Sequence, residues 1–169
     1  MRHAVRYVAT FAALTALAGW THMASAQTAG GTAEAAAEPA PAAAKPLAQS
    51  ASDPALQWGP CPPGMPEGCG ISVLQGDPAK PNADIFLRIP GGSAIPPHAH
   101  SSAERMVLVS GEMEVKYQGA PRATLKATDY AYGPANLPHQ AICRSEDTCI
   151  LFIAFEGPVD LKPFEGSLD

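Results

Sequence analysis

The residues best suited to chemistry in this 169-residue chain are three histidines and one glutamate. His98 and His100 are separated by a single residue, so on a β-strand both imidazole rings project from the same face. Glu104 has the same parity, and on a regular strand its carboxylate would join them. With His139 from elsewhere in the chain, they form a set of three nitrogen donors and one oxygen donor that suits a divalent transition metal. We therefore predict a metal site made of His98, His100, Glu104 and His139.

Short β-like runs separated by turn residues must position these four side chains. Met113, Val115 and Tyr117 alternate with charged residues, as expected of a strand with one buried and one solvated face. No helical period persists for three turns from residue 83 onward. Further apolar or aromatic runs lie at 85–89, 106–109, 130–132, 139–143 and 149–155. Six or more short strands in about 100 residues predict an all-β sandwich or barrel.

The same alternation predicts which side chains face the interior of this barrel. The apolar ones are Met106, Leu108, Met113, Val115 and Ala141. The nearest polar candidates are Arg88, Tyr117, Tyr130, Tyr132 and Gln140. We expect Tyr130 and Tyr132 to serve in packing or at the rim, and Arg88 to lie in solvent. No second carboxylate–histidine pair is present for general acid–base work, so any catalysis would depend on the metal as a Lewis acid or oxygen-binding centre.

The spacing of the glycine, histidine and acidic residues resembles the two motifs of the cupin superfamily. The anchoring positions of the first motif are matched by Gly92, His98, His100, Glu104 and Gly111. Those of the second motif are occupied by Asp129, Pro134, Asn136 and His139. Asn136 replaces the usual glycine, but asparagine is the next residue to tolerate a left-handed backbone. We therefore expect the turn before His139 to survive the replacement.

The chain is similar to small exported single-domain cupins of the conserved-barrel type, from about Trp58 to Asp160. The resemblance implies an all-β double-stranded β-helix, the jelly-roll cupin barrel, with the four residues above as metal ligands. It does not choose a function, because cupins include oxygenases, isomerases, lyases, sensors and storage proteins. Our first hypothesis is a small mononuclear metalloenzyme, oxygenase-like, acting on a small molecule. The alternative is a non-catalytic metal-binding or sensing module similar to the zinc cupin domains of certain anti-sigma factors.

The size of the pocket should separate these two hypotheses. A pocket of roughly several hundred Å³ with an open coordination position would favour the enzyme. A filled barrel with a closed four-ligand site would favour the module.

The first 26 residues have the three parts of a secretory signal peptide. Arg2 and Arg6 form a basic start, an apolar run covers 8–20, and small residues at 24–26 predict cleavage before Gln27. The apolar run is shorter than the roughly 18 residues needed to span a bilayer. Residues 27–55, rich in Ala and Pro, predict a disordered linker, and residues 56–169 the cupin domain. We therefore predict a periplasmic or secreted protein.

Four cysteines lie in the predicted domain, and an oxidising compartment favours disulfides. Four cysteines permit three pairings, of which we expect the local one, Cys61 with Cys69 and Cys143 with Cys149. Each pair brackets a short polar or turn-rich segment, and 144–148 is typical of a hairpin tip between two apolar strands. The competing interpretation is a thiolate metal site, whose cysteine spacing fits no compact zinc pattern.

Charge and export route bear on the partners and on the metal. After removal of residues 1–26 the chain has nine Lys and Arg against 16 Asp and Glu, a net charge of −7. This balance argues against nucleic acid or an anionic membrane as partner, so we expect a small-molecule substrate and leave a homodimer open. A chain exported unfolded would take its metal outside the cytoplasm, where intrinsic affinity favours copper or zinc; iron, manganese and nickel stay open.

Overall fold

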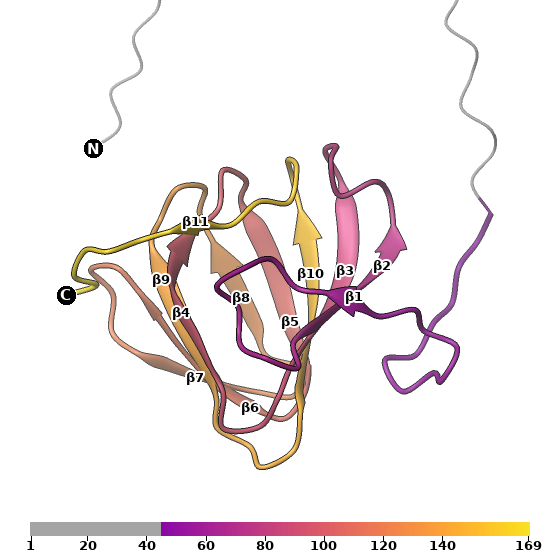
Figure 1. The fold of residues 1–169 in the computed structure, drawn as a ribbon, viewed down its shortest axis with the longest axis horizontal. Helices are drawn as coiled ribbons and strands as arrows, with labels where there is room; N and C mark the ends of the chain where they lie inside the picture. Colours follow the sequence, from indigo (N-terminus) through magenta and orange to yellow (C-terminus); the bar gives the residue numbers. More distant parts are fainter. Residues whose placement is uncertain (1–44) are drawn as a thin grey trace, which may run out of the picture. The chain divides into compact units, whose positions relative to one another are not determined.

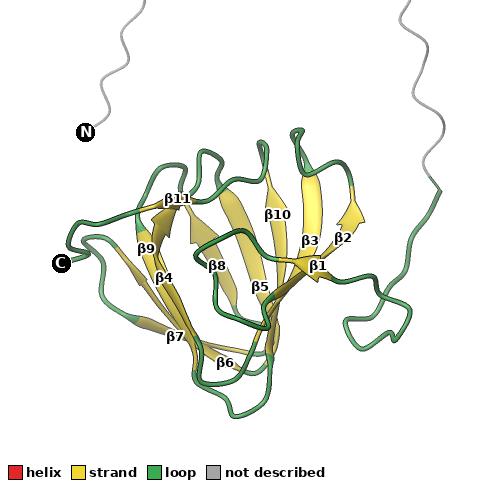
Figure 2. Cartoon of the chain, viewed as in Figure 1, coloured by secondary structure: helices red, strands yellow, loops and turns green. Residues whose placement is uncertain are grey.

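This computed structural model describes residues 45–169 of the chain. They contain eleven strands joined by loops and turns, and no helix (Figure 2). This part therefore holds no helix long and apolar enough to cross a membrane. The predicted signal peptide at 1–26 and residues 27–44 of the predicted linker lie outside it. Residues 45–55 contain no strand and are mostly exposed, and Leu56 is the first buried side chain.

The strands form two antiparallel sheets, which Figure 1 shows as two facing layers. The six-stranded sheet consists, in spatial order, of β1 (Gly59–Pro60), β2 (Gly70–Gln75), β3 (Ala83–Ile89), β10 (Cys149–Phe155), β5 (Glu104–Ser110) and β8 (Tyr130–Gly133). The five-stranded sheet consists of β11 (Lys162–Pro163), β4 (Ala94–Ala99), β9 (His139–Cys143), β6 (Glu112–Tyr117) and β7 (Ala123–Lys126). The prediction of an all-β jelly roll is confirmed.

Apolar side chains of both sheets fill the space between them. In β10, every second residue from Cys149 to Phe155 is buried, which is the period expected of a strand with one face on the core. The five residues predicted to face the interior are all buried: Met106, Leu108, Met113, Val115 and Ala141. Each large apolar side chain buried in this way contributes roughly 1.5–3 kcal/mol relative to an exposed one.

Asn136 and Gly111 each hold a turn in a left-handed conformation. Asn136 has φ 61°, so the asparagine in the second motif adopts the conformation expected of the usual glycine. Gly111, with φ 89°, joins β5 to β6 and carries the chain from one sheet to the other. A Cβ atom at Gly111 would lie 2.8 Å from the Sγ atom of Cys149, so this position also has no room for a side chain.

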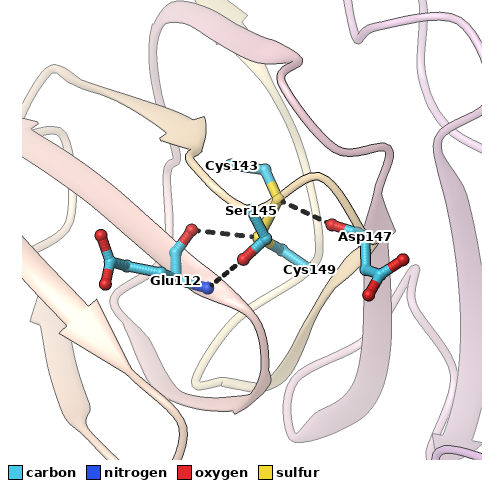
Figure 3. Close-up of a disulfide and its surroundings, with 5 residues drawn as sticks. All are labelled: Glu112, Cys143, Ser145, Asp147 and Cys149. Atoms are coloured by element: carbon cyan, nitrogen blue, oxygen red, sulfur yellow. Dashed lines mark hydrogen bonds between the residues drawn. A yellow bond between two sulfur atoms is a disulfide. The ribbon is translucent and has the colours of Figure 1, made fainter.

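A disulfide between Cys143 and Cys149 links the two sheets (Figure 3). Cys143 ends β9 and Cys149 begins β10, and these strands do not pair with each other. The segment 144–148 is therefore a crossover between sheets, and the prediction of a hairpin tip is wrong. Ser145 fixes the crossover, because its Oγ accepts a hydrogen bond of 2.7 Å from the amide of Glu112. The Cys149 sulfur lies 3.3 Å from the Glu112 carbonyl oxygen.

The second disulfide, Cys61–Cys69, closes the loop between β1 and β2. Both cysteines and Met65 of this loop pack against the core of the barrel. The structure thus contains the two local disulfides expected from the sequence, and no cysteine in the described residues is free.

Candidate metal centre

His98 and His139 face each other across neighbouring strands. They form a cross-strand pair between β4 and β9, with ring centroids 4.3 Å apart. Each follows a proline, and each uses its Nδ1 atom to contact the carbonyl oxygen of the residue before that proline. Nδ1 of His98 lies 2.8 Å from the carbonyl oxygen of Pro96, and Nδ1 of His139 lies 3.2 Å from that of Leu137. A carbonyl oxygen can only accept, so Nδ1 carries the proton and Nε2 of the neutral ring has a free lone pair.

His100 lies just beyond the end of β4 and is held by the C-terminal segment. Its Nδ1 donates to the backbone carbonyl of Asp160. The carboxylate of Asp160 in turn accepts hydrogen bonds from the amide and hydroxyl of Ser101, at 2.7 and 2.5 Å. Beyond Asp160 the chain forms β11, which pairs with β4 at His98 and Ala99. These contacts, which we call the Asp160 clasp, fix the ring of His100 with its Nε2 free.

Glu104 reaches the histidines from the opposite sheet. It begins β5, whereas His98 and His139 lie in the five-stranded sheet. The chain crosses between the sheets after His100, so the expectation that Glu104 joins the histidines along one regular strand is wrong, although the four side chains do meet. Oε1 of Glu104 lies 3.1 Å from Nε2 of His139, and Oε2 lies 3.5 Å from Nε2 of His100.

Gly133 provides the space that the Glu104 carboxylate occupies. Gly133 in β8 is the cross-strand neighbour of Glu104. A Cβ atom at position 133 would lie 2.6 Å from Oε1 and 2.8 Å from Cγ of Glu104. The absence of a side chain at this position therefore leaves the room in which the carboxylate lies.

Burial and mutual proximity set the protonation of the cluster. Burial, together with the neighbouring His139, lowers the pKa of His98 to about 4, so this ring is neutral at neutral pH. Burial alone would raise the pKa of Glu104, but contact with His139 and the nearby imidazoles lowers it overall, so the carboxylate is ionised. Burial would lower the pKa of His139, but the Glu104 carboxylate outweighs it and raises that pKa.

The donor set fits a divalent transition metal. One ring nitrogen from each of His98, His100 and His139 lies within 4.8 Å of the other two. All three rings have Nδ1 bonded to a backbone carbonyl, which leaves Nε2 as the free donor atom. All four residues are at most 9% exposed, and Glu104 Oε1 is buried without a hydrogen-bond partner. An ionised buried carboxylate needs a cation or donors to offset the loss of water, and a metal ion would supply the cation.

A cavity of about 70 Å³ lies between the sheets, and its wall includes all four side chains of the cluster. Most of the remaining wall is apolar, from both sheets and from Pro62 and Met65 of the disulfide-closed loop 61–69. No Lys or Arg of the described residues lines it. The volume is far below the roughly 300 Å³ at which ligand pockets begin, and it corresponds to a few water molecules.

The remaining polar candidates lie away from this cavity or at its margin. Tyr130 and Tyr132 are 58% and 49% exposed, and the side chain of Arg88 lies over the ring of Trp58 at 4.7 Å. Tyr117 comes close to the cluster, with its ring centroid 5.2 Å from that of His139. Sequence reasoning missed Gly133, Ser101 and Asp160, whose roles depend on contacts between distant segments.

A double antiparallel sheet that encloses this set of three histidines and a glutamate defines the protein as a cupin. The chain belongs to the family of ChrR cupin-like domains, whose model matches residues 49–160. No curated protein matches the sequence significantly.

Solved cupin structures share the fold at low sequence identity. A structure of the DMSP lyases RdDddP and RnDddQII has a TM-score of 0.57 and 18% identity, covering 65% of this chain and 63% of that one. The DMSP lyase DddQ from Ruegeria pomeroyi DSS-3 has a TM-score of 0.56 and 21% identity, covering 66% and 64%. An RmlC-like cupin from Shewanella frigidimarina NCIMB 400 has a TM-score of 0.50 and 21% identity, covering 62% and 86%. The chain therefore spans less than two thirds of either lyase structure, and these likenesses concern the fold.

Proposed function

We propose that this protein binds one divalent transition metal through His98, His100, His139 and Glu104. The observation that carries the proposal is the hydrogen bonding of the three rings. Each Nδ1 is bonded to a backbone carbonyl, which leaves the three Nε2 atoms to bind a metal beside an ionised carboxylate. Such carbonyl partners fix the tautomer and the orientation of ligating histidines in metalloproteins generally.

The size of the cavity favours a non-catalytic metal-binding or sensing module as the role of this centre. Four side-chain donors suffice for a closed tetrahedral site, and about 70 Å³ leaves no room for a substrate of ordinary size. Membership of the ChrR cupin-like family fits this function. We expect copper or zinc as the metal, with iron, manganese and nickel as the alternatives.

A small mononuclear metalloenzyme, oxygenase-like, is the second candidate, and the contact between cavity and cluster supports it. When bound, the metal would supply Lewis acidity or an oxygen-binding centre. The chain itself would contribute an apolar wall that excludes water, and it places no cationic side chain there to bind an anionic substrate. A substrate of this enzyme would therefore be a neutral molecule of a few heavy atoms, or one bound through the metal alone.

Titration of the metal-free protein with Co²⁺ tests the proposal and separates the two candidates. We expect visible absorption that saturates at one equivalent, with the intensity of four-coordinate cobalt. A spectrum that azide leaves unchanged would support a closed site and the module, whereas a shift on adding azide would show an exchangeable position and support the enzyme. Absorption that never saturates would contradict metal binding itself.

We also propose that the protein is exported to an oxidising compartment. Two disulfides support this location, because such bonds persist outside the reducing cytoplasm. The predicted signal peptide lies outside the described residues and stays a prediction. Mass spectrometry of the protein expressed with its own N-terminus should find Gln27 as the first residue.

A further inference from the structure

Two buried side-chain atoms in the described part of the chain have no hydrogen-bond partner, and both lie beside His139. One is Oε1 of Glu104, an acceptor in the ionised carboxylate, which lies 3.1 Å from Nε2 of His139, the atom that would bind the metal. The other is the hydroxyl of Tyr117, which can donate. A buried polar group without a partner is costly, so each such group in a folded protein needs an explanation.

The backbone directs Tyr117 toward the metal centre. It is the last residue of β6, and the residues two and four positions earlier, Val115 and Met113, point into the barrel and line the cavity. Because side chains alternate along a strand, Tyr117 continues this inward face. It lies directly opposite His139 in β9, and the two rings are tilted by 39°.

Tyr117 and Glu104 both lie beside His139. The ring centroid of Tyr117 is 5.2 Å from that of His139, and Oε1 of Glu104 is 3.1 Å from its Nε2. A tyrosine hydroxyl keeps its proton at neutral pH and is available as a donor. Tyr132 is about half exposed, and Arg88 lies over Trp58, so neither of these offers Glu104 a comparable buried donor.

We propose that Tyr117 is a positioning residue of the metal centre, whose hydroxyl donates a hydrogen bond to the Glu104 carboxylate when that carboxylate binds the metal. The proposal rests on the proposed function, in which Glu104 is a ligand. A carboxylate that gives one oxygen to a metal keeps lone pairs free on the other, and ligating carboxylates are normally hydrogen-bonded by a neighbouring group. Tyr117 provides an unpartnered buried donor at this place.

This role predicts that Tyr117 stabilises metal binding but not the metal-free fold. In the metal-free protein the hydroxyl has no partner, so its removal loses no hydrogen bond. In the metal-loaded protein the same removal leaves the carboxylate without its donor. The substitution Tyr117→Phe keeps the ring and its packing on His139, so the variant should fold.

The test compares the parent, Tyr117→Phe and the control Tyr132→Phe by chelator competition for Zn²⁺ and by thermal melting without metal. We expect Tyr117→Phe to bind Zn²⁺ about tenfold more weakly and to melt, when metal-free, at or above the parent temperature. Tyr132→Phe should match the parent in both measurements. In a Glu104→Ala background, Tyr117→Phe should have no further effect on affinity, because the group on which it acts is gone.

Three outcomes would overturn the proposal in distinguishable ways. Equal Zn²⁺ affinity of the parent and Tyr117→Phe would remove the role of Tyr117 and leave the metal site standing. A metal affinity that falls equally with and without Glu104 would show that Tyr117 acts by another route. A parent protein that binds no Zn²⁺ would overturn both this proposal and the proposed function.

Discussion

Each histidine of the cluster is oriented by a backbone carbonyl of its own. His98 and His139 share a local arrangement, in which the ring contacts the carbonyl that precedes the intervening proline. Proline fixes φ near −65° and the residue before it is held extended, so the accepting carbonyl has a limited range of positions. The pattern Pro-His occurs at both sites in the sequence and was the signal that pattern reasoning overlooked.

The substitution Gly133→Ala should weaken metal binding without unfolding the protein. The new methyl group would lie within 3 Å of the Glu104 side chain and would push its carboxylate away from the histidines. We expect the affinity for Zn²⁺ to fall about tenfold to a hundredfold, the range seen when ligand support is lost. Chelator competition measures the affinity, and circular dichroism checks the fold.

Gly59→Ala is the matched control for this experiment. A Cβ atom there would meet only one backbone oxygen, at an ordinary 3.8 Å, and the metal affinity should stay that of the parent. An unchanged affinity in Gly133→Ala would show that Glu104 is not confined by position 133.

Residue-level inference from the sequence succeeded where a local rule applied. Asn136 was expected to adopt a left-handed conformation, and it has φ 61°. Gly133 could not be recognised, because its role depends on the strand that lies beside it. The sequence shows only that residue 133 is glycine. The side chain that occupies the space beside it, Glu104, is known only once the neighbouring strand is identified.

At the scale of elements, the centre depends on the chain crossing between sheets. In the sequence, parity along one regular strand groups Glu104 with His98 and His100. In the structure β4 and β5 belong to opposite sheets, and the crossover at 100–103 brings Glu104 to the cluster from the facing side. The alternation of residues identifies strands and their buried faces, but it does not say which sheet each strand joins.

The Asp160 clasp should connect the C-terminal segment to metal affinity. In Asp160→Ala the carboxylate that binds Ser101 is lost, and the carbonyl that orients His100 becomes less firmly held. We expect the Zn²⁺ affinity to fall about tenfold and the free energy of unfolding to fall by about 1 kcal/mol. Isothermal titration and urea unfolding measure the two effects.

Asp77→Ala serves as the comparison for the clasp. Asp77 makes only local contacts, including a 3.4 Å ion pair with Lys80 on the surface. Its replacement should change neither quantity appreciably, since exposed ion pairs contribute little. If Asp160→Ala bound Zn²⁺ as tightly as Asp77→Ala, the carboxylate would have no part in orienting His100.

At the scale of the whole molecule, two disulfides limit how far the barrel can open. Cys143–Cys149 ties one sheet to the other, and Cys61–Cys69 constrains the loop that contributes Pro62 and Met65 to the cavity wall. The local pairing was predictable because each pair brackets a short segment. That the Cys143–Cys149 segment crosses between sheets was not, because both a hairpin and a crossover can join two apolar strands.

Removal of the Cys143–Cys149 bond should lower the free energy of unfolding by roughly 2–3 kcal/mol, because a disulfide that closes so short a loop stabilises the protein by about that amount. The double variant Cys143→Ala and Cys149→Ala tests this by urea unfolding, with the intact protein as reference. Both cysteines are fully buried, so any additional loss reports the smaller side chains in the core. A variant as stable as the parent would show that the bond does not stabilise the native fold.

Binding of one metal ion by the four side chains at the junction of the sheets can be measured directly. The most direct measurement is the metal content of the protein secreted through its own N-terminal segment and purified without added metal, determined by mass spectrometry for the parent and for His139→Ala. We expect close to one equivalent of a transition metal in the parent, with copper or zinc predominating, and almost none in His139→Ala. Iron or manganese would change the expected metal and leave the ligands standing. A metal-free parent, or a His139→Ala variant that retains the full equivalent, would contradict the assignment.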